Sequence, residues 1–379
     1  MTCDRRTERP LPVSLYFTPE WWDEHFHGLF VRPEEASQQA LETLYLRRLR
    51  FLFEQFGTFG LGAEAPQLGP GQIATVIRYG FDLVPVLLGT QLDLANAWGF
   101  YPHFRPLGHL AGLSAVDVAR TAEGDWLLRE QERLTALYGG CSHCLDLGSA
   151  INNAFRLLGQ DAYAEMVAQP REMAHLLDVI LETMEHLYRF LVVHFGPMDP
   201  VPISNCNVSL AGPRIYERVL LAYDAWQNRF AERLTGAAPR ANVHHCDVPV
   251  DDFLTVYRQL PGVASLQASL RSDIAAAKQQ FSDSTFSALV SPSDLGGGPG
   301  GWEGDLDRAL AAGVDDLAIW NVDAATPPAA LLEAMERMTR LAARHGRQAQ
   351  YTAQPLCWEE IEWAHERYGG VPRPGAYLG

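Results

Sequence analysis

The sequence predicts an α/β protein, namely a (β/α)8 TIM barrel with an N-terminal helical extension. From residue 200 onward, short apolar runs alternate five times with stretches of helical periodicity. This alternation of strand and helix indicates βα units and a parallel sheet. The number of units and the length of 379 residues favour a closed barrel. No Gly-x-Gly-x-x-Gly stands directly at the end of an expected strand, which argues against an open dinucleotide-binding sheet.

The extension is assigned to residues 1–55, and the barrel domain to residues 56–379. Two adjacent tryptophans, Trp21 and Trp22, precede a helical pattern over residues 33–56 that has leucines among charged positions. Because two indoles need apolar surface to bury against, we expect this segment to pack over or beside the barrel mouth.

The middle of the chain divides into two regions. Residues 57–125 are rich in Gly, Pro and aromatic side chains and show weak periodicity, which indicates short strands and loops. Residues 148–195 carry apolar side chains at helical spacing. They predict helices that are interrupted near Gly159 and Pro170.

The C-terminal half supplies the regular βα pattern. Strands are expected at residues 201–209, 241–245, 264–269, 285–290, 315–321 and 348–352. Helices are expected at residues 213–234, 249–259, 271–280, 303–312 and 327–345. A glycine-rich run at residues 296–301 predicts a flexible loop between two of these units.

Composition limits the partners and the compartment. Acidic residues outnumber basic ones by 46 to 30, and the basic residues are scattered, so we expect no nucleic-acid partner. No signal peptide stands at the N-terminus and no apolar stretch has the length of a membrane span. Six cysteines are too few for a disulfide scaffold. We therefore expect a soluble, cytoplasmic protein with reduced thiols and no membrane partner.

Polar side chains stand where the expected strands end. In a parallel barrel these positions meet at one mouth, where the active site lies. Asn205, Cys206 and Asn207 lie in the last part of the first strand of the regular half, Gln267 lies near the end of the third, and Asn321 ends the fifth. We expect these five residues to bind a small-molecule substrate.

The second of these strands ends in His244-His245-Cys246. Residues i and i+2 of a strand face the same side, so His244 and Cys246 could bind one metal ion while His245 faces away. The spacing alone fits a histidine and a buried cysteine without metal equally well.

Four segments of the C-terminal half resemble the uroporphyrinogen decarboxylase superfamily, and within it the cobalamin-linked methyltransferases that act with coenzyme M or related acceptors. These segments are residues 211–217 with 221–223, Val243-His244-His245-Cys246, residues 263–267 with 273–278, and residues 318–320 with 325–329. The resemblance implies a (β/α)8 barrel and a divalent metal, zinc, held by the His-x-Cys pair. It also implies a corrinoid that is carried by a partner protein.

The sequence departs from this family at two places. The decarboxylases carry an arginine-rich N-terminal segment, whereas residues 20–25 here are acidic and aromatic, which argues against porphyrinogen decarboxylation. The methyltransferases carry a third cysteine after the last strand, where this chain has Asp323. Asp323 could be an oxygen ligand, or it could cap the helix that begins near Thr326. Cys206 could instead supply a second sulfur.

Two further groups of side chains have open roles. Cys141 and Cys144 have Cys-x-x-Cys spacing, but the chain holds no second such pair, which excludes a zinc ribbon and favours thiols of the core or site wall. His25 and His27 either cover the barrel mouth or pack among aromatic side chains.

The leading hypothesis is a metal-dependent small-molecule transferase that moves a methyl group to or from a thiol or a corrinoid partner. A metal-dependent lyase or oxidative enzyme on the same barrel is the first alternative, with iron at a His/Cys/Asp site. A non-catalytic binding barrel is the second. The metal content of the purified protein separates the three.

Overall fold

The computed structural model describes residues 9–26, 38–67, 74–76, 82–96, 99–138, 142–144, 147–196, 201–246, 248–296 and 301–353. Its main feature is an all-parallel sheet of seven strands in the order β11-β1-β10-β9-β8-β7-β6. These strands are β1 (Arg9–Phe17), β6 (Val201–Ser204), β7 (Ala241–His244), β8 (Val263–Ser269), β9 (Thr285–Val290), β10 (Asp316–Val322) and β11 (Arg347–Ala353). The prediction of an α/β fold with a parallel sheet is confirmed.

The described residues also form two short sheets of two strands each. β2 (Ala74–Val76) pairs in parallel with β5 (Ser142–Cys144), and β3 (Leu92–Asn96) forms an antiparallel hairpin with β4 (Gly99–Pro102). Neither pair is hydrogen-bonded to the large sheet within the described ranges. The described strands therefore do not by themselves close into the expected barrel.

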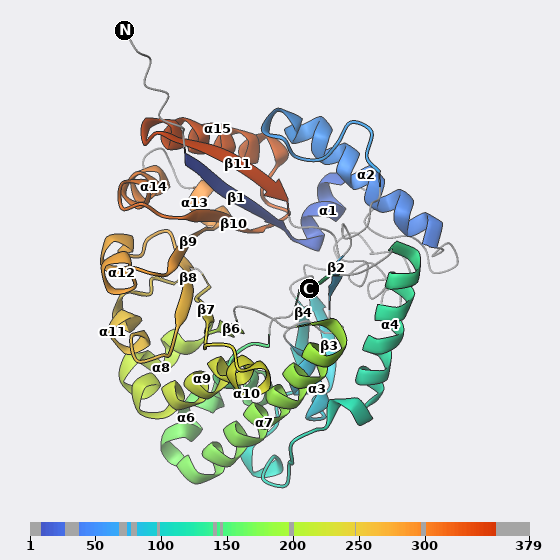
Figure 1. Ribbon diagram of the computed structural model, residues 1–379, viewed down its shortest axis with the longest axis vertical. Coiled ribbons are helices and arrows are strands. Elements are labelled where there is room, and N and C mark those ends of the chain that lie inside the picture. The colour runs from blue at the N-terminus through green and yellow to red at the C-terminus, as the bar shows by residue number, and fades with distance from the viewer. Residues whose placement is uncertain are drawn as a thin grey trace.

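Helices surround the sheet, and Figure 1 shows its strands on the inner side of a ring of helices. The first half of the chain contains α1 (Pro19–Phe26), α2 (Gln38–Phe56), α3 (Leu83–Leu87), α4 (Ala122–Tyr138), α5 (Ala150–Leu158), α6 (Asp161–Ala168) and α7 (Pro170–Phe195). The second half contains α8 (Val208–Ile215), α9 (Leu221–Asn228), α10 (Phe230–Thr235), α11 (Leu254–Tyr257), α12 (Ile274–Gln280), α13 (Pro292–Gly296), α14 (Gly301–Ala311) and α15 (Pro328–Arg344), with a π-helical turn (Tyr216–Leu220) between α8 and α9.

The helix breaks expected in the middle of the chain are confirmed. Gly159 ends α5 with a φ of 68°, a left-handed conformation that glycine adopts without strain, and its N–H bonds to the Phe155 carbonyl. Pro170 begins α7, where its missing N–H costs no helical hydrogen bond. α4 was not expected from the sequence, and α1 was expected only as an aromatic segment.

β1 corrects the prediction of a purely helical extension, because it lies inside the large sheet. It pairs with β11 along Arg9–Leu15 and with β10 only from Val13 onward. Pro10 and Pro12 therefore lie where β1 has one neighbour, at positions where a missing N–H is tolerated. The described part of residues 1–55 and the strands after residue 200 consequently share one sheet.

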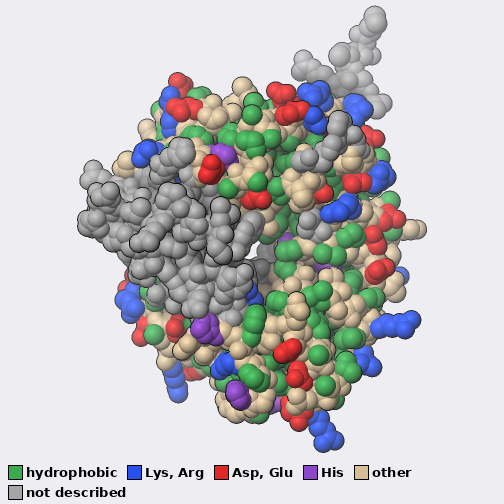
Figure 2. All heavy atoms as spheres, turned by 180° about the vertical axis from the view of Figure 1, so that it is seen from behind, with side chains coloured by type: hydrophobic (Ala, Val, Ile, Leu, Met, Phe, Trp, Pro, Cys, Tyr) green, Lys and Arg blue, Asp and Glu red, His purple; other side chains and the backbone are tan. Residues whose placement is uncertain are grey.

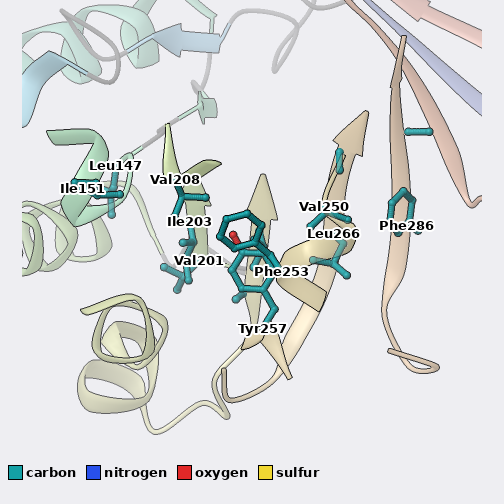
Figure 3. Close-up of a cluster of buried hydrophobic side chains, with 14 of the residues drawn as sticks. Leu147, Ile151, Val201, Ile203, Val208, Val250, Phe253, Tyr257, Leu266 and Phe286 are labelled. Atoms are coloured by element: carbon teal, nitrogen blue, oxygen red, sulfur yellow. The ribbon is translucent and has the colours of Figure 1, made fainter. Parts of the chain in front are cut away.

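The core lies between the outer face of the sheet and the helices. Figure 3 shows this packing around β6–β9, where Val201 and Ile203 of β6 belong to one cluster of buried side chains with Phe253 and Tyr257. Alternate strand residues face opposite sides. Because the residues between these apolar positions face inward, the inner side of the sheet is the polar side.

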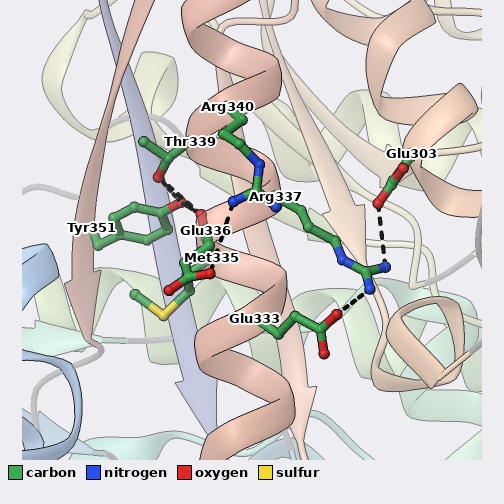
Figure 4. Close-up of polar contacts among 8 residues, drawn as sticks. All are labelled: Glu303, Glu333, Met335, Glu336, Arg337, Thr339, Arg340 and Tyr351. Atoms are coloured by element: carbon green, nitrogen blue, oxygen red, sulfur yellow. Dashed lines mark hydrogen bonds and ion pairs between the residues drawn. The ribbon is translucent and has the colours of Figure 1, made fainter.

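α15 is fixed to the sheet and to α14 by polar contacts (Figure 4). The Tyr351 hydroxyl of β11 donates to the Met335 carbonyl at 2.7 Å and lies 3.0 Å from the Thr339 hydroxyl. Arg337 contacts Glu333 on its own helix and Glu303 of α14 at 3.3 Å. These contacts hold α15, the helix that connects β10 with β11, against β11 and α14.

The two N-terminal tryptophans are buried, at 0% exposure for Trp21 and 4% for Trp22. Their rings contact Phe17, Phe51 and Phe56. The Trp21 Nε1–H donates to the Thr326 carbonyl, just after β10, at 2.9 Å. The two indoles are therefore buried, as expected, and Trp21 lies beside the loop that follows the carboxyl end of β10.

Figure 2 shows the face opposite to that of Figure 1, and on its described part the Lys and Arg side chains are scattered among other types. Within the described ranges no helix combines the length and the hydropathy that crossing a membrane requires.

Candidate metal centre

Three side chains with metal-binding atoms meet at the carboxyl ends of β6 and β7. Cys206 lies two residues after β6, His244 ends β7, and Cys246 lies two residues further on. The Asn205 N–H donates to the His244 carbonyl at 2.8 Å, which extends the strand pairing past the end of β6. This backbone bond holds the Cys206 turn against β7.

The ligand atoms of these three residues all lie within 4.8 Å of one another, and no other such group occurs among the described residues. His244 Nε2 is 2.8 Å from Cys246 Sγ, and the two sulfurs are 2.9 Å apart. Both cysteines are free thiols. Around a tetrahedral zinc ion the sulfurs would be roughly 3.7 Å apart. To hold zinc, the two sulfurs would therefore move apart by roughly 0.8 Å.

A hydrogen bond to Gln267 sets the orientation of the His244 ring. His244 Nδ1 lies 2.6 Å from Gln267 Oε1 on the neighbouring strand β8, and an amide oxygen can only accept. Nδ1 therefore carries the proton, and Nε2 presents its lone pair toward Cys246. Metal-binding histidines in general use this arrangement, with one nitrogen on the metal and the other donating to an oxygen.

An aromatic wall stands beside His244. The Trp320 ring of β10 has its centroid 5.4 Å from the His244 ring and 4.5 Å from the Tyr16 ring of β1. Asn321 follows in a left-handed conformation, with a φ of 60°, at a bulge in the pairing of β1 with β10. Bulges of this kind re-aim side chains, and they occur often beside active sites.

His245 lies on the opposite side of its strand, as its spacing predicted. It is 1% exposed, packs against the Phe253 and Tyr257 rings, and contacts the Tyr257 hydroxyl through Nε2. Burial, together with the charge of the adjacent His244, lowers the pKa of His245 to about 3. His245 is therefore neutral near pH 7 and belongs to the core.

Asn205 was expected to contact substrate, but its side chain is completely buried. Its Nδ2 donates to Asp224 Oδ2 at 2.8 Å and lies 3.2 Å from the Tyr257 hydroxyl. The Tyr216 hydroxyl donates to the same Asp224 oxygen at 2.6 Å. Asn205 is therefore part of a buried network that supports the Cys206 turn. It does not line the site.

This network makes the stability of the protein depend on pH. Burial raises the pKa of Asp224 from 3.8 to about 6, so between these values the folded state binds a proton that the unfolded state releases. The contribution of Asp224 is therefore complete below pH 3.8 and is lost as the pH rises through 6. We expect the unfolding free energy of the wild type, relative to Asp224→Asn, to fall by on the order of 3 kcal/mol from pH 4 to pH 7. Urea unfolding at both pH values measures this difference, and a constant difference would contradict it.

The other residues that were expected to bind substrate have different surroundings. Asn207 is half-buried, and its backbone bonds to the Asn152 side chain and the Tyr163 hydroxyl. Asn321 lies at the bulge beside Trp320. Gln267 faces the cluster as expected, but it binds His244.

Asp323 is not part of the cluster. Its Oδ1 accepts hydrogen bonds from the Ala325 N–H at 3.0 Å and the Thr326 hydroxyl at 3.1 Å, so it organises the turn before α15. The prediction of Asp323 as the third ligand is therefore replaced by Cys206, the alternative that the sequence left open. The sequence places Cys206 at a strand end, but only the fold brings its sulfur to Cys246.

The remaining candidate side chains are those of two histidines and two cysteines. His27 and Cys141 lie outside the described residues, and Cys144 is described only as the last residue of β5. His25 is half-buried, packs on the Trp21 ring, and has Nε2 3.2 Å from the Ala324 carbonyl. This arrangement agrees with a role in aromatic packing.

Comparisons with known proteins bear on the fold. Neither the models of protein families nor the curated proteins gave a match. Among solved structures, the chain is similar to a methyltransferase from Methanosarcina mazei, with a TM-score of 0.57 and 15% identity. The alignment covers 88% of this chain and 94% of that one. At this identity the similarity shows a shared fold.

Proposed function

We propose that this chain is a zinc-dependent methyltransferase that moves a methyl group between a corrinoid on a partner protein and a small thiol. The observation that carries the proposal is the Cys206-His244-Cys246 cluster at the carboxyl edge of a parallel sheet. The similarity in fold to a methyltransferase supports it. The resemblance in sequence to the cobalamin-linked branch of the uroporphyrinogen decarboxylase superfamily supports it independently.

The donor set fits zinc. Two thiolate sulfurs and an imidazole nitrogen are soft to borderline ligands, which zinc accepts in tetrahedral geometry. Three protein ligands leave a fourth position for substrate, as in catalytic zinc sites. The iron alternative depended on an oxygen ligand from Asp323, and this carboxylate is bonded within its own turn.

The residues around the cluster have distinct tasks in this proposal. A bound zinc ion supplies the chemistry of lowering the pKa of a thiol substrate, so that a thiolate is available near neutral pH. Gln267 holds the His244 proton on Nδ1 and so keeps Nε2 available as a ligand. Trp320 and Tyr16 form an apolar wall that limits water beside the reacting sulfur. Cys206 and Cys246 are only half-buried, so a substrate can approach them.

We also propose that the seven-stranded sheet is the larger part of a closed β/α barrel of the TIM type, and that the β2–β5 pair completes the ring. The parallel pairing of these two short strands supports closure, as does the ring of helices in Figure 1. Reduced thiols at the cluster would agree with a cytoplasmic location.

The full chain, purified without added metal, tests the proposal. We expect one zinc per chain by mass spectrometry of the metals. We also expect thiol-dependent consumption of methylcobalamin, with coenzyme M as the first thiol in the panel. The carbon–sulfur bond forms as the cobalt–carbon bond breaks and its electron pair stays on cobalt, so the products are a methyl thioether and cob(I)alamin.

Each other outcome refutes part of the proposal. Stoichiometric iron would favour the lyase or oxidative alternative, and absence of metal would favour the binding barrel. Zinc without methyl transfer to any thiol in the panel would refute the reaction. A chelator should abolish the transfer, and added zinc should restore it.

A further inference from the structure

Four polar side chains occupy one level of the large sheet. The strand pairing places His244 of β7 opposite Gln267 of β8, Gln267 opposite Ser287 of β9, and Ser287 opposite Asp316 of β10. The flanking residues Leu266, Phe286 and Leu317 are buried on the outer face. Because strand residues alternate, all four polar side chains lie on the inner face.

Hydrogen bonds join three of these side chains, and the fourth, Asp316, lies beside Ser287. His244 Nδ1 is 2.6 Å from Gln267 Oε1, and Gln267 Nε2 is 3.3 Å from the Ser287 hydroxyl. The pairing of β9 with β10 places Asp316 beside Ser287, and while burial raises the pKa of the Asp316 carboxyl, contact with the Ser287 hydroxyl lowers it. We call this series the inner ladder. It crosses four adjacent strands and ends at the metal centre.

The chemistry of its members fixes the direction of every bond in the inner ladder. An ionised carboxylate only accepts, so Ser287 donates its single proton to Asp316. The Ser287 oxygen is then an acceptor, and it must face the NH₂ group of Gln267. The amide oxygen of Gln267 is thereby turned toward His244, whose Nδ1 must donate.

A reversed Gln267 amide would have the opposite effect. Its NH₂ group would face Nδ1, which would then hold the lone pair, and the proton would move to Nε2. Nε2 could not bind a metal in that form. Imidazole tautomers and amide orientations are close in energy, so the neighbours decide between them.

We propose that Ser287 and Asp316 are positioning residues that act through Gln267 to hold His244 with its proton on Nδ1 and its Nε2 lone pair toward Cys206 and Cys246. This inference deepens the proposed function, because it concerns the same centre. The tautomer itself is a property of the metal-free protein. It can therefore be tested whether or not methyl transfer occurs.

The test compares Ser287→Ala with Ser265→Ala. Ser265 lies on the same face of β8 and donates to Asn242 Oδ1 at 2.6 Å, one step before the inner ladder in the pairing of β7 with β8. Both variants lose one hydroxyl from an interstrand hydrogen bond, but only Ser287 is linked to His244. Asp316→Asn adds a variant of unchanged size, in which the terminal group can donate as well as accept.

The first readout is nitrogen NMR of the metal-free full chain with labelled histidine, in which the His244 signal is assigned by its absence in His244→Gln. We expect the Nδ1-protonated form in the wild type and in Ser265→Ala, and a mixture of tautomers in Ser287→Ala and Asp316→Asn. The second readout is zinc affinity by competition with a chromophoric chelator. We expect about a 10- to 100-fold loss in Ser287→Ala.

Two results would overturn the proposal. One is a wild-type tautomer in both Ser287→Ala and Asp316→Asn. The other, for a wild type that binds zinc, is a zinc affinity of Ser287→Ala equal to that of Ser265→Ala. If the wild type shows the expected tautomer but binds no zinc, the proposed function fails while the role of the inner ladder in orienting His244 stands.

Discussion

Replacing either sulfur of the metal centre is expected to abolish metal binding at micromolar zinc. Cys206→Ser and Cys246→Ser each remove one of three ligand atoms that lie within 4.8 Å of one another. Loss of a residue that merely orients a ligand costs about 10- to 100-fold in affinity, so loss of a ligand itself should exceed about 100-fold. Serine keeps the size of cysteine and offers a poor ligand for zinc. Chelator competition on the purified variants measures the loss.

Asp323→Asn is the matched control, because it tests the competing ligand. Asn retains an oxygen that can accept from the Ala325 N–H and the Thr326 hydroxyl, so the turn before α15 should persist. We expect zinc affinity to remain within about twofold of the wild type, which is under 0.5 kcal/mol. If Asp323→Asn lost the metal while Cys206→Ser kept it, the assignment of the third ligand would be wrong.

The sequence predicted the order of strands and helices in the regular half of the fold, but the strand expected at residues 201–209 ends at Ser204, and α8 begins at Val208. Strands of apolar residues that are bounded by amphipathic helices leave little ambiguity, and β9 lies at the expected residues 285–290. β1 was missed because Pro10 and Pro12 argue against an inner strand, and only the pairing shows that β1 has a single neighbour at these positions. Whether the barrel closes depends on contacts between distant segments, which local periodicity does not encode.

The sequence likewise placed some residues of the candidate site correctly and missed the position of others. The two-residue period of a strand sufficed to place His244 and Cys246 on one side and His245 on the other. The approach of Cys206 depends on the pairing of β6 with β7 across 40 residues of sequence. A polar residue at a strand end is visible in the sequence. Whether it faces a substrate, as was expected of Asn205, or a buried carboxylate is decided by tertiary contacts.

Ser287 and Asp316 were missed for a related reason. Ser287 is a small polar residue within an apolar strand, a pattern that many strands tolerate without functional meaning. Its significance arises only from register, since it stands opposite Gln267 on one side and Asp316 on the other. A polar residue between buried neighbours was the signal in the sequence, and the partner strands give it a role.

The anchoring of the N-terminal segment leads to the prediction with the largest expected effect on stability. Trp21 is fully buried among aromatic rings, the nearest being Phe17 at 4.2 Å between centroids. Trp21→Ala removes the whole indole from the core, and we expect a loss of about 3–5 kcal/mol in unfolding free energy. Trp226 is the control, because its side chain is half-exposed and its contacts with Arg233 and Glu185 lie at the surface. Trp226→Ala should cost about 1 kcal/mol or less.

A second variant separates packing from hydrogen bonding at the same position. Trp21→Phe keeps a buried ring but loses the Nε1–H that donates to the Thr326 carbonyl at 2.9 Å. We expect an intermediate loss, with about 1–3 kcal/mol from the carbonyl that is left without this donor. Urea unfolding followed by far-ultraviolet circular dichroism measures all three variants without relying on tryptophan emission. Equal losses for Trp21→Ala and Trp226→Ala would contradict a buried anchor between α1 and the loop after β10.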